Sequence, residues 1–134
     1  GNEYIDLSFV KDEKGRFVYD GGTATYPLDG VTEVDNYSSN WTEEQINSLR
    51  TKDQAYLGPI TSLSEVVREH PQAKGAWRSI KVHSSGIMHK SVDLDYTDQN
   101  SPIKKAQLLR LSFEYNEKKK DYYLSYNSAA RGHW

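Results

Sequence analysis

Hydrophobic and polar residues alternate with a period of two near both ends of the chain, and this pattern predicts β-strands there. Residues 4–10 place three apolar side chains on one face, namely Ile5, Leu7 and Phe9. A polar loop over residues 11–16 then leads to a second apolar run at residues 17–19, and this order predicts a β-hairpin. Residues 23–40 are rich in Thr, Asp, Asn, Ser and Gly, which predicts a long irregular connection with at most one short strand.

Two helix starts follow the connection. Each is a capping box, in which a Ser or Thr and a Gln or Glu three residues later satisfy the first amides of the helix. The boxes are Thr42 with Gln45 and Ser62 with Glu65. After the first box, apolar residues recur at helical spacing as far as Leu57, where Gly58 and Pro59 end the pattern, and Pro71 ends the second segment. The sequence therefore predicts two consecutive central helices.

From residue 76 onward the chain returns to strict alternation, which predicts an antiparallel meander of four strands. The predicted buried positions are Ala76, Ile80 and Val82, then Met88, Val92, Leu94 and Tyr96, then Leu109, Leu111, Phe113 and Tyr115, then Tyr122, Leu124 and Tyr126. Because the helices and strands are segregated along the chain, the fold class is α+β. We expect a single α+β domain over residues 1–134, in which the N-terminal hairpin and the meander form an antiparallel sheet with the two helices packed on one face.

Length, composition and motifs exclude several classes of function. The 134 residues suit one domain, and the absence of cysteine excludes thiol nucleophiles and Cys-based zinc sites. A net charge of −2 argues against a nucleic-acid partner. No apolar run approaches the ~20 residues of a membrane-spanning helix, so we expect no transmembrane segment in this chain. The sequence also lacks a nucleotide-binding glycine loop, HExxH and a nucleophile elbow, so we predict no catalytic residue and no cofactor.

Aromatic residues are numerous for so polar a chain, with ten Tyr and three Trp at a mean hydropathy of −0.83. Tyr and Trp suit binding surfaces because each brings a large apolar area together with a hydrogen-bonding tip. Several of them fall outside the predicted core faces, and four of these are the predicted ligand-binding residues: Tyr37, Trp77, Tyr123 and Trp134. The first hypothesis is therefore a non-catalytic module that binds a protein or a glycan through exposed aromatic side chains.

A polar cluster gives a second hypothesis. His83, His89 and Asp93 lie at alternate positions on the solvent face of the predicted hairpin over residues 76–96. Imidazole and carboxylate groups together bind Zn²⁺ and similar ions, so a small metal-dependent or hydrolytic enzyme would use these three residues. An ordinary solvated sheet face explains the same pattern, and we therefore predict no metal and keep the enzyme as the alternative.

The distribution of charge gives a third hypothesis. Residues 1–67 carry a net charge of −7, whereas residues 68–134 carry +5. An uneven electrostatic field suits an inhibitor or immunity-type protein that acts by surface complementarity.

The start of the chain bears on its compartment. The chain begins with Gly1, the residue that a protease leaves when it removes an expression tag. We expect a native start upstream with an export signal or a lipid anchor, as in the soluble part of a bacterial exported protein or lipoprotein. The expected location is the periplasm or the cell surface, with the cytoplasm as the alternative.

Overall fold

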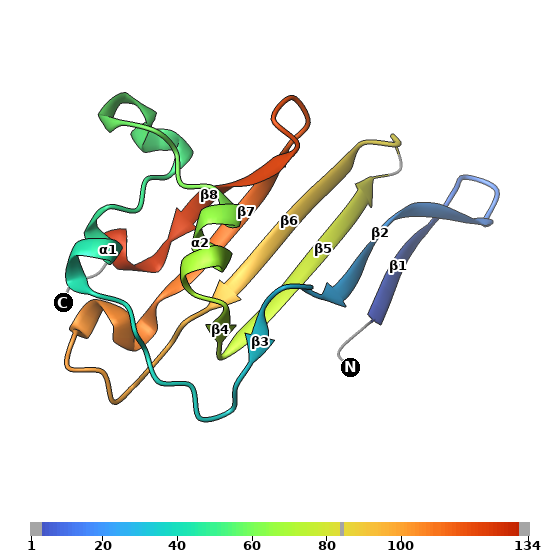
Figure 1. Ribbon diagram of the computed structural model, residues 1–134. Helices are drawn as coiled ribbons and strands as arrows, with labels where there is room; N and C mark the ends of the chain where they lie inside the picture. Colours follow the sequence, from blue (N-terminus) through green and yellow to red (C-terminus); the bar gives the residue numbers. More distant parts are fainter. Residues whose placement is uncertain (1–3, 84, 132–134) are drawn as a thin grey trace.

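The computed structural model describes residues 4–83 and 85–131, and within them one large antiparallel sheet dominates the fold (Figure 1). The strands are β1 (Tyr4–Lys11), β2 (Phe17–Pro27), β3 (Thr32–Glu33), β4 (Gln72–Ala73), β5 (Gly75–His83), β6 (Met88–Asp95), β7 (Arg110–Asn116) and β8 (Asp121–Asn127). Six of them form a sheet in the order β1-β2-β5-β6-β7-β8, and β3 pairs with β4 in parallel beside it. The predicted α+β class with an antiparallel sheet is confirmed.

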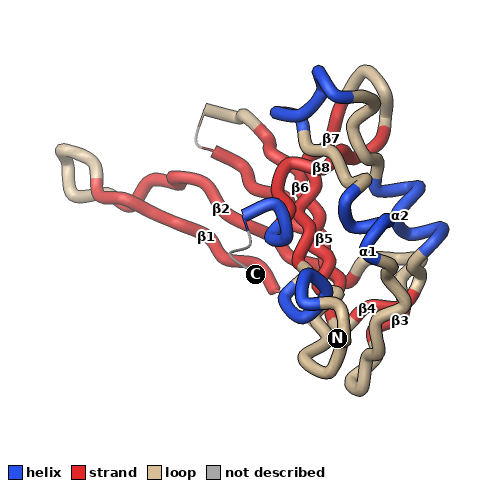
Figure 2. Tube along the Cα trace, turned by 90° about the vertical axis from the view of Figure 1, so that its left-hand side faces the viewer, coloured by secondary structure: helices blue, strands red, loops and turns tan. Residues whose placement is uncertain are grey.

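Two short α-helices cover one face of this sheet. They are α1 (Glu43–Asn47) and α2 (Leu63–Glu69), and three 3-10 helices accompany them: η1 (Lys52–Leu57), η2 (Lys104–Leu108) and η3 (Ser128–Arg131). Figure 2 shows α1 and α2 on one side of the strands. Ile46, Leu63 and Val66 of the helices belong to the same buried cluster as the inward residues of the sheet. Those sheet residues include Val92, Leu94, Leu111, Phe113 and Leu124. No helix within residues 4–83 and 85–131 is long and apolar enough to cross a membrane.

The first predicted helix is divided into two. α1 ends at Asn47, and a new start follows in which the amide of Thr51 donates to Gln54 Oε1 at 3.0 Å. The intervening chain is tied to the next element, because the amide of Arg50 donates to Thr61 Oγ1 at 2.9 Å. Apolar residues continue at helical spacing as far as Leu57, but in η1 this spacing does not correspond to a buried face, since Tyr56 is 81% exposed.

The second predicted helix is confirmed as α2. Its capping box is complete, with the Glu65 amide donating to Ser62 Oγ and the Ser62 amide donating to Glu65 Oε1. The same segment also covers the outer edge of β8, because the amide of Leu124 donates to the carbonyl of Thr61 at 2.9 Å. One edge of the large sheet is therefore closed by a loop.

The N-terminal hairpin is longer than the sequence indicated. β2 runs on through Pro27, so its second half replaces the start of the predicted irregular connection and pairs with β5. Gly21 lies where β2 begins to pair with β5, and this position requires glycine. Its φ is +110°, and an added Cβ would lie 2.5 Å from the carbonyl oxygen of Val82. A side chain cannot occupy that position without moving the backbone of β5.

The helices leave half of the sheet bare. In Figure 1 they lie in front of β6, β7 and β8, whereas nothing lies in front of β1 and β2. Ile5, Leu7 and Phe9 are consequently 70%, 54% and 53% exposed. Met88, predicted as a core residue, is 55% exposed because it is the first residue of β6, and the helices lie over the other end of that strand (Figure 1).

Candidate ligand-binding site

The face of the sheet opposite the helices carries a row of four side chains from four neighbouring strands. Trp77 of β5 pairs with Asp93 of β6, Asp93 pairs with Ser112 of β7, and Ser112 pairs with Tyr126 of β8. Since directly opposed residues point to the same face, all four side chains border one shallow depression of about 430 Å³. Asp95 and Arg110 border it in the adjacent row, where they are also opposed.

Trp77 forms one side of the depression, and Gly75 determines how its ring lies. A Cβ added at Gly75 would lie only 2.9 Å from Cζ3 of the indole, so the ring covers the space that a side chain would occupy. Glycine thus lets the indole lie close against the backbone two residues before it. Trp77 remains 38% exposed, which leaves part of the ring to solvent at the side of the depression.

The floor of the depression carries carboxylates that the protein itself orients. Ser112 Oγ donates to Asp93 Oδ1 at 2.5 Å, and the amide of Thr97 donates to Asp95 Oδ1 at 2.9 Å. Arg110 Nε lies 3.9 Å from Asp95 Oδ2, although the Arg110 side chain is 65% exposed. Two carboxylates and one guanidinium give this surface a local charge of about −1 with fixed hydrogen-bond acceptors and one adaptable donor.

Tyr126 borders the depression on the side away from Trp77. The sequence predicted Tyr126 as a core residue, and this prediction is wrong. The pairing shifts by one residue between Ser112 and Phe113, so Leu124 opposes Phe113 while Tyr126 opposes Ser112. The extra residue, Ser125, turns Tyr126 onto the open face, where it is 37% exposed. Three strand spacings separate the two aromatic residues, which is about 14 Å between their backbones.

A second depression lies between α1 and α2, and it has a different chemistry. Its volume is about 320 Å³, and its lining includes Arg50, Glu65 and Glu69. The Trp41 that borders it is only 4% exposed, so it presents little aromatic surface. The open sheet face is therefore the better candidate for a ligand that packs on a ring.

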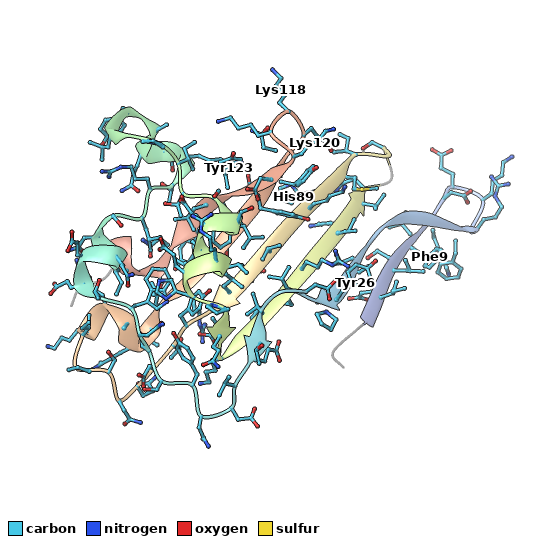
Figure 3. The ribbon with its side chains drawn as sticks, in the orientation of Figure 1. Phe9, Tyr26, His89, Lys118, Lys120 and Tyr123 are labelled. Atoms are coloured by element: carbon cyan, nitrogen blue, oxygen red, sulfur yellow. The ribbon has the colours of Figure 1, made fainter. Side chains whose placement is uncertain are left out.

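The predicted ligand-binding residues are not gathered in one place. Trp77 borders the depression, and Trp134 lies outside the described residues. Tyr123 points to the same open face but opposes Glu114, nearer the β7–β8 loop, where the Lys119 ammonium lies 5.1 Å from its ring centroid. Figure 3 shows Tyr123 and His89 toward the end of the sheet that carries this loop, with Lys118 and Lys120 beyond them.

Tyr37 is a core residue and not a surface aromatic. It is 8% exposed, and its ring centroid lies 6.0 Å from that of Tyr96. Burial raises the pKa of its hydroxyl above the usual 10.0. The sequence around Tyr37 is polar and has no apolar period, but the loop from β3 to α1 folds onto the sheet and buries the ring. A surface role for Tyr37 is thus replaced by a packing role.

The histidines of the second hypothesis do not meet Asp93. His89 opposes Lys81, and its Nε2 lies 3.8 Å from Glu114 Oε1, which itself pairs with Lys52. Asp93 lies four residues further along β6, about 13 Å away, and accepts from Ser112. The exposed His83 is near the opposite end of the strand from Trp77. Across the part of the chain that the structure describes, no group of three or more His, Asp or Glu side chains is arranged to hold a metal ion.

Sequence reasoning missed four residues of the candidate site, and a signal was present for three of them: Gly75, Arg110 and Ser112, but not Tyr126. Arg110 and Ser112 follow from the strand alternation, because each lies beside a predicted core residue and so points to the opposite face. Gly75 stands two residues before Trp77, the spacing at which it shares a face with the indole. Comparison of the chain with protein-family models, curated proteins and solved structures finds no match.

Proposed function

We propose that this chain is a non-catalytic binding module that holds a saccharide on the open face of its sheet. The observation that carries the proposal is the Trp77 indole lying over Gly75 beside the oriented carboxylates of Asp93 and Asp95. A pyranose ring has apolar C–H groups on its faces and hydroxyl groups around its rim. A partly exposed indole next to fixed acceptors and a guanidinium matches both features.

The charges of the depression indicate which saccharides fit. Asp93 and Asp95 outnumber Arg110, so neutral and amino sugars are favoured over uronic acids. The depression is shallow and open, which suits one or two sugar units of a longer chain. Polymers of this kind are abundant outside the cytoplasm, and the proposal therefore includes an extracytoplasmic location.

The test is a calorimetric titration with three defined trisaccharides: N-acetylglucosamine trimer, glucosamine trimer and galacturonic acid trimer. We expect dissociation constants on the order of 0.1–1 mM for the first two and no measurable heat for the third. Trp77→Ala should weaken binding at least tenfold without unfolding the protein.

The matched control is Tyr56→Ala, which removes a more exposed aromatic residue that does not border the depression. This variant should bind like the wild type. Equal affinity of Trp77→Ala and wild-type protein, or binding of none of the three sugars, would overturn the proposal.

A further inference from the structure

The large sheet has two edge strands, β1 and β8. The loop before α2 covers the β8 edge, whereas the β1 edge is exposed. β1 is the first strand in the sheet order, and among the described residues only β2 pairs with it. Its eight residues contain no proline. The pairing with β2 shifts between Leu7 and Phe9, but the additional residue lies in β2, so β1 itself has no bulge. Natural sheets usually protect such an edge, because its unpaired amides and carbonyls accept another strand.

The position of the hairpin leaves this edge accessible. Figure 2 shows β1 and β2 extending away from the helices, and Figure 3 shows Phe9 on that projecting arm. Ile5 and Leu7 present apolar side chains along the edge strand that are more than half exposed. Exposed apolar residues on an open edge strand combine the two properties that favour strand addition.

We infer that two copies of this chain associate through antiparallel pairing of their β1 edges, with Leu7 at the two-fold axis. In a symmetric pair of this kind the axis is perpendicular to the sheet, so residues on one face of β1 meet residues on the same face of the second copy. Leu7 then opposes Leu7 of the second copy, and Ile5 opposes Phe9. The β1 sequence is thus complementary to itself in this register.

Neighbouring registers are less favourable. Centring the pair on Asp6 would place two carboxylates directly opposite each other, which is destabilising in a sheet. Centring it on Ser8 would oppose Ile5 to Lys11, whose ammonium instead lies 5.4 Å from the ring centroid of Phe17 in its own hairpin. The register centred on Leu7 opposes no like charges and aligns all three apolar residues.

The pairing buries one strand edge per copy, which is less than the ~1,200 Å² of a stable interface. We therefore expect a reversible dimer with a dissociation constant on the order of 10–100 µM. Sedimentation velocity of the full chain between 5 and 500 µM should show a shift from monomer to dimer. Leu7→Lys places two like charges at the axis and should keep the protein monomeric over the whole range.

Phe17→Lys distinguishes edge pairing from packing of the bare apolar face. Phe17 is 70% exposed, opposes Lys11 and lies on the inner strand of the hairpin. The variant should therefore still dimerise. Loss of the dimer in Phe17→Lys as well as in Leu7→Lys would overturn edge pairing, as would a wild-type chain that stays monomeric at 500 µM.

Single cysteines test the register, because the chain has none of its own. With oxidised glutathione as the oxidant, Leu7→Cys should form a disulfide-linked dimer, since the two thiols meet at the axis. Phe9→Cys is the matched control, because its two copies would lie about 13 Å apart in this register. Cross-linking of Phe9→Cys in preference to Leu7→Cys would refute the inferred pairing even if the chain is dimeric.

Discussion

The indole of Trp41 lies parallel to the imidazole of His70, with ring centroids 3.7 Å apart and an interplanar angle of 7°. His70 is 2% exposed, and its Nδ1 lies 2.9 Å from Asn40 Oδ1. The hydroxyl of Tyr96 donates to the carbonyl of His70 at 2.8 Å. The histidine that ends α2 is thus enclosed by the loop before α1 and by the end of β6.

This enclosure makes stability depend on pH. Burial lowers the pKa of His70 below 6.5, and the nearby Glu69 carboxylate opposes this effect only in part. The folded protein therefore binds a proton on this imidazole less readily than the unfolded chain, which takes up the proton as the pH falls through about 6.5. The His70 contribution is present in full above that pH and is lost progressively below it, so the free energy of unfolding should be lower at pH 5 than at pH 7.

Urea denaturation of His70→Gln and of the wild type at both pH values tests this expectation. The variant should be less stable at pH 7, because it loses the stack on Trp41, but it should lose less stability between pH 7 and pH 5. His83→Gln is the control, because it makes the same chemical change at an exposed position. A wild-type and a His70→Gln protein with the same pH dependence would show that other groups control acid stability.

The sheet should respond differently to the same substitution in its covered and bare halves. Leu124 is fully buried beneath the helices, whereas Leu7 is 54% exposed on β1. Leu124→Ala should therefore lower the free energy of unfolding by about 2–5 kcal/mol. Leu7→Ala should lower it by less than about 1 kcal/mol, measured at a concentration where the chain is monomeric. A large loss in Leu7→Ala would mean that something covers that face of the hairpin.

The strand pattern predicted most of this fold because period-two alternation and capping residues are local signals. The capping box at Ser62 identified the start of α2, and alternation identified β5 to β8. The period alone could not show which apolar faces the helices would reach, and so Met88 was predicted as buried although it is 55% exposed. Nor could it detect the bulge at Ser125, since a single extra residue in β8 is determined by the pairing with β7.

The candidate site was only partly predictable for a related reason. Trp77 was recognised because no apolar stripe includes it, whereas Tyr37 has the same local signature and is buried. The difference lies in long-range packing, since Tyr37 is buried by contact with Tyr96, a residue that is distant in the sequence. Composition therefore identified an unusually large number of aromatic residues. Only the tertiary structure shows which of them are exposed, like Trp77, and which pack in the core, like Tyr37.

The capping box of α2 should contribute to stability in a measurable way. Ser62 Oγ accepts from the amide of Glu65, and α2 is a short helix that depends on such end contacts. Ser62→Ala should lower the free energy of unfolding by about 1 kcal/mol in chemical denaturation. Ser62→Asp keeps an acceptor at the same position and should restore most of that loss. If Ser62→Ala and Ser62→Asp are equally destabilised, the loss comes from the contact with β8 and not from the cap.

Gly75 gives the sharpest test of the role assigned to the Trp77 ring. Gly75→Ala brings a methyl group within 2.9 Å of Cζ3, and the ring must move because it is the more flexible partner. Gly75 has no positive φ, so alanine fits the backbone, and the free energy of unfolding should stay within about 1 kcal/mol of the wild type. Affinity for the glucosamine trimer should nevertheless fall severalfold, and the fluorescence spectrum should change as the indole leaves its position.

A double-mutant cycle separates this indirect effect from any direct contact of Gly75 with the sugar. If Gly75 acts only by positioning the indole, adding Gly75→Ala to Trp77→Ala should cause no further loss of affinity. A further loss would mean that the backbone at Gly75 itself contacts the ligand, whereas unchanged affinity in the single Gly75→Ala variant would show that binding does not depend on how the ring lies. The cycle thus measures how much of the effect of Gly75 on affinity depends on the Trp77 ring.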